Sequence, residues 1–347
     1  ERTHAASIPL ALIIVFALAL SVRAEVIYVK TDGSDAANGT SWANAYATVQ
    51  KALSESNSTR NQIWVKHGDY YLDTGPDQTG NAPTSTFRLR NNIAMYGGFA
   101  GTESNVSERD LSDPANETAL SGDLDQDGNY DDDLDAYHVV TCDSGATANT
   151  ILDGFTIERG NATGSGSDGG AAGFMNISQQ TSATFRNCLF QSNKSDAGAG
   201  AVYLHNENGG SDCAVTFEDC VFLNNEAGQI ANQSTWGGAV YCSLRGNATF
   251  TRCRFLGNHA DGNGGALACA ESTITLLNCE FVGNTARNPD PNIVGGKGGA
   301  VYLHASAWTP ETAATFINCA ITENASEDDG AGDDIPYPGG GAIYCEA

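Results

Sequence analysis

Five oxygen-bearing side chains alternate through one short acidic stretch of the sequence. They are Asp123, Asp125, Asp127, Asn129 and Asp131. Gly128 lies among them, where the chain would have to turn. This spacing matches the first part of an EF-hand-like calcium loop, in which alternate residues direct oxygen ligands towards one ion. We therefore expect these five residues to form a calcium site.

The second half of this stretch departs from the EF-hand pattern. The twelfth position, where a bidentate acidic side chain is needed, is Leu134. Asp132, Asp133 or Asp135 could supply that carboxylate if the loop is irregular. The alternative is a solvated acidic insertion without a metal, and the sequence leaves both interpretations open.

From Thr150 onwards the chain repeats one template, in which Phe, Cys, Phe and Asn recur at fixed spacing. The first clear copy is Phe185, Cys188, Phe190 and Asn193, and later copies end at Asn225, Asn258, Asn284 and Asn324. The steps between these Asn residues are 32, 33, 26 and 40 residues. Strands that begin Gly-Gly-Ala, as at Ala239, lie between the copies. Because length varies only between the motifs, the pattern predicts stacked coils with loops of different size.

The repeat predicts an all-β fold, a right-handed parallel β-helix with an N-terminal capping helix. Residues two apart in a strand face the same side, so Cys188 and Phe190 would share one core. The recurring Asn residues are expected to hydrogen-bond from coil to coil as a ladder. The Gly pairs fit sharp corners, where a positive φ or the approach of the next coil excludes a Cβ.

The chain has 10 cysteines, but their spacing argues against a disulfide framework. Stacked coils lie about 4.8 Å apart, which exceeds the Cβ separation of about 3.8 Å that a disulfide prefers. The cysteines of the repeat are therefore expected to be small buried apolar residues: Cys188, Cys220, Cys253, Cys279 and Cys319. Cys142 and Cys213 fit no column, so a disulfide there stays open.

The chain divides by composition into four parts. Residues 1–24 resemble a signal peptide cleaved after Ala24, with a buried strand or an uncleaved anchor as the alternative. Residues 25–115 would form the cap and first coils, with strands at 26–30, 63–66, 87–89 and 93–96 and a helix from Asn44 to Leu53. Residues 116–137 read as the acidic calcium-loop-like insertion and 138–347 as the β-helix repeats. The sequence stops where another coil is expected, so we expect its own β-helix to continue.

The net charge of −25 would repel a nucleic acid, and no run of Lys or Arg offsets it. The apolar run of the signal peptide is too short to span a bilayer comfortably. We therefore expect no nucleic acid partner and no transmembrane helix in the mature chain. The expected partners are an extracellular glycan or a host or cell-surface protein.

The Cys-x-Phe-x-x-Asn and Gly-Gly-Ala-Val-Tyr elements, from about Asn149 onwards, resemble the repeats of chlamydial polymorphic outer membrane proteins. The start, including 27–34 and 96–99, is similar to secreted bacterial right-handed β-helix proteins of the pectate-lyase-like superfamily. These resemblances imply a secreted or cell-surface protein, with an outer-membrane location as one form of it. They imply a role in adhesion or surface structure.

The alternative function is a polysaccharide lyase or glycoside hydrolase, because the same superfamily includes such enzymes. The outward positions beside each Cys-x-Phe pair are mostly apolar, and Arg254 and Glu280 are expected to form a surface ion pair. His205 and His304 follow the same Tyr-Leu pair and are interpreted as one recurrent position. We identify no catalytic residue, and the sequence favours a non-catalytic protein without deciding the question.

Overall fold

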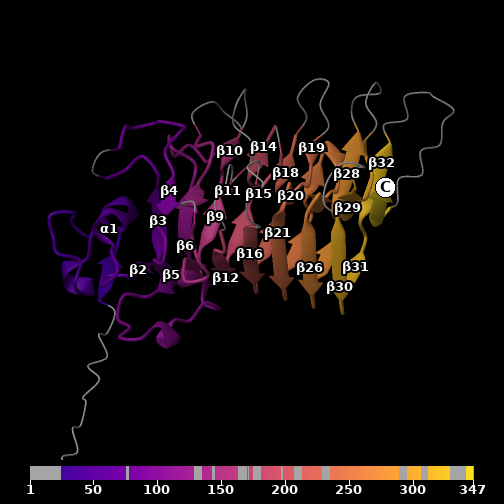
Figure 1. Ribbon diagram of the computed structural model, residues 1–347. Coiled ribbons are helices and arrows are strands. Elements are labelled where there is room, and N and C mark those ends of the chain that lie inside the picture. The colour runs from indigo at the N-terminus through magenta and orange to yellow at the C-terminus, as the bar shows by residue number, and fades with distance from the viewer. Residues whose placement is uncertain are drawn as a thin grey trace, which may run out of the picture.

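A computed structural model of the protein describes residues 25–75, 78–128, 135–142, 145–162, 170, 172–174, 181–196, 198–206, 213–228, 235–288, 295–305, 312–328 and 341–346. The expected signal peptide, 1–24, lies outside these residues. The described strands wind into coils that stack along one axis, from the indigo to the yellow end of Figure 1. The strands pair in parallel, coil upon coil, so the predicted parallel β-helix is confirmed.

Two long sheets contain the strands that the Phe-Cys-Phe template predicts. The first sheet is, in stacking order, β1 (Val26–Val29), β2 (Gln62–Lys66), β5 (Ala94–Phe99), β8 (Ile151–Asp153), β12 (Thr184–Arg186), β16 (Cys213–Glu218), β21 (Gly246–Thr251), β26 (Thr273–Leu277) and β30 (Ala313–Ile317). The second sheet is β3 (Gly68–Tyr71), β6 (Thr118–Ser121), β9 (Thr156–Glu158), β13 (Leu189–Gln191), β17 (Val221–Leu223), β22 (Arg254–Leu256), β27 (Glu280–Val282) and β31 (Ala320–Thr322). The bend between these sheets lies at each Cys, as the odd spacing from Phe to Cys requires.

The remaining strands close each coil. The third sheet is β10 (Asn161–Ala162), β14 (Lys194–Ser195), β18 (Glu226–Ala227), β23 (His259–Ala260), β28 (Thr285–Asn288) and β32 (Ala325–Asp328). The fourth sheet is β4 (Phe87–Leu89), β7 (Val140–Cys142), β11 (Ala172–Phe174), β15 (Val202–His205), β20 (Val240–Ser243), β25 (Leu267–Ala270), β29 (Val301–His304) and β33 (Ile343–Glu346). A short pair, β19 (Thr235–Trp236) and β24 (Gly262–Asn263), lies beside them.

The core is a set of aligned side-chain columns. Phe217 stacks on Phe185 at 5.2 Å and on Phe250 at 5.0 Å between ring centroids. A second column of Phe rings runs beside it through β13, β17, β22 and β27, with spacings of 4.9, 4.7 and 4.5 Å. Burying each such ring contributes about 1.5–3 kcal/mol, so the repeated Phe positions account for a large part of the stability.

The Asn ladder is also confirmed. Nδ2 of Asn225 donates to Oδ1 of Asn258 at 2.9 Å and to the backbone oxygen of Phe190 at 3.0 Å. The same arrangement recurs at Asn193, Asn258 and Asn284, whose side chains are fully buried. Each amide therefore joins its own coil to both neighbours, and this satisfies polar groups that burial would otherwise leave without partners.

The Gly-Gly corners show both of the expected constraints. Gly237 has a φ of +78°, which L side chains rarely adopt. Next to it, a Cβ on Gly238 would overlap the backbone oxygen of Gly265 in the following coil. The corner thus brings two backbones into direct contact, and no larger residue fits there.

None of the ten cysteines forms a disulfide in the structure, so it does not support the disulfide that the sequence left open at Cys142 and Cys213. The Cys of each repeat donates from Sγ to the carbonyl of the preceding coil, as Cys253 does to Phe217 at 3.4 Å. Burial raises the pKa of Cys213 to about 12 and that of Cys269 to about 12. Cys213 and Cys269 are therefore protonated at neutral pH, which keeps their thiols unreactive.

The first coils are less regular. The helix α1 is Val49–Glu55, shorter than the expected 44–53, and three 3₁₀ turns accompany it: η1 (Trp42–Asn44), η2 (Val106–Glu108) and η3 (Pro114–Asn116). The helix starts late because Tyr46 pairs with β1, donating to Tyr28, while Thr48 accepts from the Lys51 amide as the N-cap. The helix lies at the N-terminal end of the stack (Figure 1), and its function as a cap stays a prediction.

Candidate metal centre

The acidic stretch leaves the solenoid directly after β6. Part of the expected insertion, 116–137, is therefore a strand of the second sheet, because Thr118–Ser121 pairs with β3 and β9. The chain returns at Ala136, whose amide donates to the oxygen of Gly122 at 2.8 Å. The oxygen of Ala136 in turn accepts from the amide of Asn161 at 2.8 Å. Both ends of the excursion are thus fixed to the coil.

Asp123 is the most constrained side chain of the stretch, with 1% of its surface exposed. Its Oδ2 accepts from the Gly128 amide at 3.1 Å and from Nη1 of Arg159 at 2.7 Å. Gly128 has a φ of +84°, so the predicted turn at this glycine is confirmed. The other oxygen, Oδ1, is buried and has no hydrogen-bond partner in the described part of the chain.

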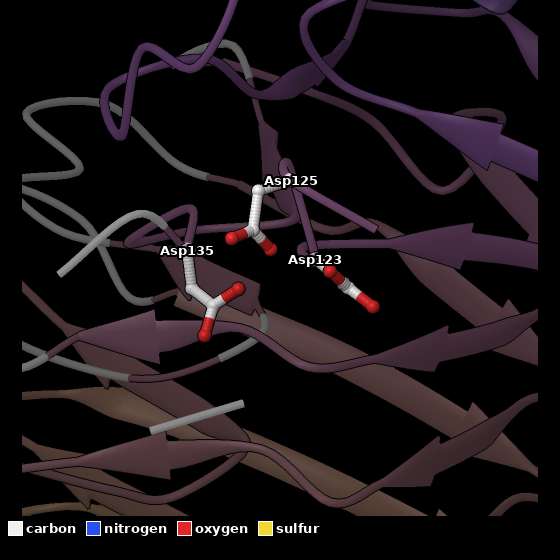
Figure 2. A group of neighbouring side chains, drawn as sticks. All are labelled: Asp123, Asp125 and Asp135. Atoms are coloured by element: carbon white, nitrogen blue, oxygen red, sulfur yellow. The ribbon is translucent and has the colours of Figure 1, made fainter. Parts of the chain in front are cut away.

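The carboxylates of Asp123, Asp125 and Asp135 converge on one point. Each offers an oxygen, and these oxygens all lie within 4.8 Å of one another. Figure 2 shows the carboxyl groups of Asp123, Asp125 and Asp135 lying close to one another. Asp135 is 2% exposed, whereas Asp125 is more accessible. The arrangement places three acidic groups where a cation could contact all of them.

Arg159 borders the cluster on the side of Oδ2. Burial would lower its pKa, but the neighbouring carboxylates of Glu158 and Asp123 raise it, so the guanidinium stays charged. Its ion pair with Asp123 engages Oδ2 and leaves Oδ1 without a hydrogen-bond partner among the described residues. The guanidinium therefore offsets part of the negative charge of Asp123.

The structure brings together some of the predicted ligands and separates others. Asp123 and Asp125 belong to the cluster, but Asp127 is exposed and is not part of it. Asn129 and Asp131 lie outside the described residues, as do Asp132 and Asp133. Asp135, one of the three substitutes that the sequence offers for the twelfth position, supplies the third carboxylate.

The residues weighed as catalytic candidates have ordinary structural partners. Arg254 pairs with Glu280 on the next coil at 2.7 Å, and their side chains are 54% and 42% exposed, as expected of a surface ion pair. Nδ1 of His205 lies 2.7 Å from Oγ of Ser243. His304 occupies the position equivalent to His205 three coils away, so the recurrent position is confirmed.

An aromatic column on the fourth sheet was not predicted. Tyr203 and Tyr241 stack at 5.1 Å, and the column is interrupted where Ala268 follows Tyr241. The ring of Trp236 fills the interruption, 5.3 Å from Tyr241 and 5.3 Å from Tyr302. The recurring Tyr of the Gly-Gly-Ala strands could have predicted this column from the sequence. The sequence does not show that Trp236, from the separate strand β19, completes it.

Comparison with known proteins identifies the repeat. Residues 219–243 and 252–270 match the family model described as Chlamydia polymorphic membrane protein (Chlamydia_PMP) repeat. Each matched stretch runs from a Cys-x-Phe strand of the second sheet through the Asn turn to a Gly-Gly-Ala strand of the fourth. No curated protein and no solved structure matches the chain. These two stretches of the regular coils are therefore similar to the Chlamydia polymorphic membrane protein repeat.

Proposed function

We propose that this protein acts at the outer surface of the cell, as an adhesive or structural β-helix without catalytic activity. The match to the polymorphic membrane protein repeat carries this proposal, because that family is named for membrane proteins. In the described residues no helix is long and apolar enough to cross a membrane.

The side chains of the regular coils suit a binding surface. On the outward face of the second sheet, Arg254 and Glu280 form an ion pair between neighbouring coils. The aromatic column of the fourth sheet has Tyr203, Trp236 and Tyr241 partly exposed. Tyr and Trp are enriched at protein interfaces, because they offer a large contact area at low entropic cost. We place the contact with an extracellular glycan or a cell-surface protein on this column.

Protease treatment of intact cells that produce the protein tests the location. A surface protein is cleaved without lysis, whereas a cytoplasmic marker in the same cells stays intact. Protection of the protein until the cells are lysed would contradict the proposed location.

A combined binding and turnover assay tests the activity. The purified full chain is incubated with host cells and with a panel of acidic and neutral polysaccharides, and both retention and reducing-end release are measured. We expect retention without release, weakened by Trp236→Ala and unchanged by the control Arg254→Ala. Release of reducing ends would support the polysaccharide lyase or hydrolase alternative and overturn the non-catalytic proposal.

A further inference from the structure

We propose that Asp123, Asp125 and Asp135 bind one calcium ion, with Asp135 in the place that the linear motif assigns to Asp127. This site does not depend on the surface role, since it follows from the geometry of the loop after β6. The evidence is the convergence of the three carboxylates together with a buried oxygen that has no partner.

The unpartnered oxygen is the observation that points to a ligand. Asp123 is 1% exposed, and its Oδ2 is fully engaged by Gly128 and Arg159. Its Oδ1 is buried without a hydrogen bond among the described residues. A buried carboxylate oxygen costs free energy unless a donor or a cation compensates it. A cation between the three acids would provide that compensation and would also remove the repulsion between them.

The chemistry of the donors favours calcium. The cluster consists only of carboxylates, which are the hard oxygen ligands that Ca²⁺ and Mg²⁺ prefer, and it contains neither His nor Cys. Oxygens on opposite sides of a Ca²⁺ ion with bonds of about 2.4 Å lie about 4.8 Å apart. Oxygens within 4.8 Å of one another can therefore share such an ion. Calcium tolerates an irregular set of six to eight oxygens, whereas Mg²⁺ demands a near-ideal octahedron.

The position of Asp127 distinguishes this site from a regular EF-hand loop. Its backbone amide donates to Oδ1 of Asp125 at 3.3 Å, and its side chain is exposed outside the cluster. Asp135 instead lies on the returning chain, next to Ala136, which is bonded to Gly122. The ion would therefore join the outgoing and returning ends of the excursion and hold both against the coil of β6.

The experiment compares single Asp-to-Asn variants of the full chain. After removal of divalent ions by chelation and dialysis, each protein is titrated with CaCl₂ by isothermal titration calorimetry, up to about 10 mM, because extracellular calcium modules bind at about 0.1–1 mM. We expect one saturable site in the wild type. Asp125→Asn and Asp135→Asn should weaken its affinity at least about tenfold, whereas the control Asp127→Asn should change it less than about twofold.

Thermal melting provides a second readout. A ligand that binds only the folded state raises the melting temperature, so calcium should raise it for the wild type and for Asp127→Asn but not for Asp135→Asn. Asp135 is buried, so if its variant fails to fold by circular dichroism, the more accessible Asp125→Asn decides the question by the same measurements.

Three outcomes would overturn the proposal. They are the absence of saturable calcium binding and of any shift in the wild type, loss of binding in Asp127→Asn with retention in Asp135→Asn, and tighter binding of Mg²⁺ than of Ca²⁺. None of these outcomes bears on the location and adhesion assays, so failure of this site and failure of the proposed function are distinguishable.

Discussion

Up to β8 the coils are joined by side-chain contacts that occur once, whereas beyond β8 they are joined by side-chain contacts that recur from coil to coil. In the first region, Arg109 bonds the oxygen of Gly97 at 2.8 Å and pairs with Asp153 at 3.2 Å, and its guanidinium lies 5.3 Å from the Tyr96 ring centroid. In the second region, the Asn ladder and the Phe columns repeat the same contact from one coil to the next.

The difference shows two ways to stabilise one architecture. A contact that occurs once can join segments of unequal shape, such as the 3₁₀ turn η2 and the strand β5, but nothing nearby replaces it. A repeated contact requires regular coils, and its energy is shared along a column of similar neighbours. The two regions should therefore respond differently to substitution.

The largest effect is expected for Arg109→Ala. The side chains of Arg109 and Asp153 are 7% and 10% exposed, so the substitution leaves a buried carboxylate without its cation. Removing one partner of a buried ion pair costs about 3–5 kcal/mol. Urea unfolding followed by circular dichroism measures the loss. Arg109→Lys should recover part of it, and a loss below about 1 kcal/mol for Arg109→Ala would contradict the importance of this pair.

A somewhat smaller effect is expected for Asn258→Ala, in the middle of the ladder. The substitution removes the acceptor of the Asn225 amide groups and the donor to Phe222, and each lost bond costs about 1 kcal/mol or more. We expect a loss of about 3 kcal/mol. Because Asn225 and Asn258 share bonds, the double substitution to Ala should cost less than the sum of the two. A double-mutant cycle measures this difference in the free energy of unfolding. If the losses of the two single substitutions simply add, the two Asn side chains do not stabilise each other.

The smallest effect is expected for Arg254→Ala, which removes an exposed ion pair of the regular coils. Exposed ion pairs contribute about 0–1 kcal/mol and weaken as salt increases. The free energy of unfolding should therefore fall by less than about 1 kcal/mol, and by less still at about 1 M NaCl. A loss as large as that for Asn258→Ala would contradict this prediction, because it would mean that an exposed ion pair stabilises the fold as much as the buried hydrogen bonds of the ladder.

The repeated features were accessible from the sequence because identical residue types at equivalent positions reveal them. Asn193 to Asn324, the Phe columns and the Gly-Gly corners were all predicted with their roles. The contacts that occur once were not. Arg109 and Asp153 are 44 residues apart, and no pattern connects them. The late start of α1 depends on Tyr46 pairing with β1, which outweighs the helical spacing of the apolar residues.

The candidate metal centre falls between these cases. The alternation of acids identified the stretch and two of the three clustered carboxylates. Which later acid completes the cluster depends on the path by which the chain returns, and that path is set by the bond of Ala136 to Gly122 rather than by spacing. Sequence could therefore offer Asp135 as a substitute but could not select it over Asp132 or Asp133.

The contact between Gly238 and the Gly265 oxygen also affects how the coils assemble. A newly folding coil that slipped by one residue, so that Ala239 took the place of Gly238, would press a Cβ into the neighbouring backbone at this corner. Misaligned intermediates are thereby penalised at each corner while the chain is still adding coils. The glycine pair thus penalises misaligned coils by steric overlap during folding, and it should favour growth of the solenoid in a single alignment.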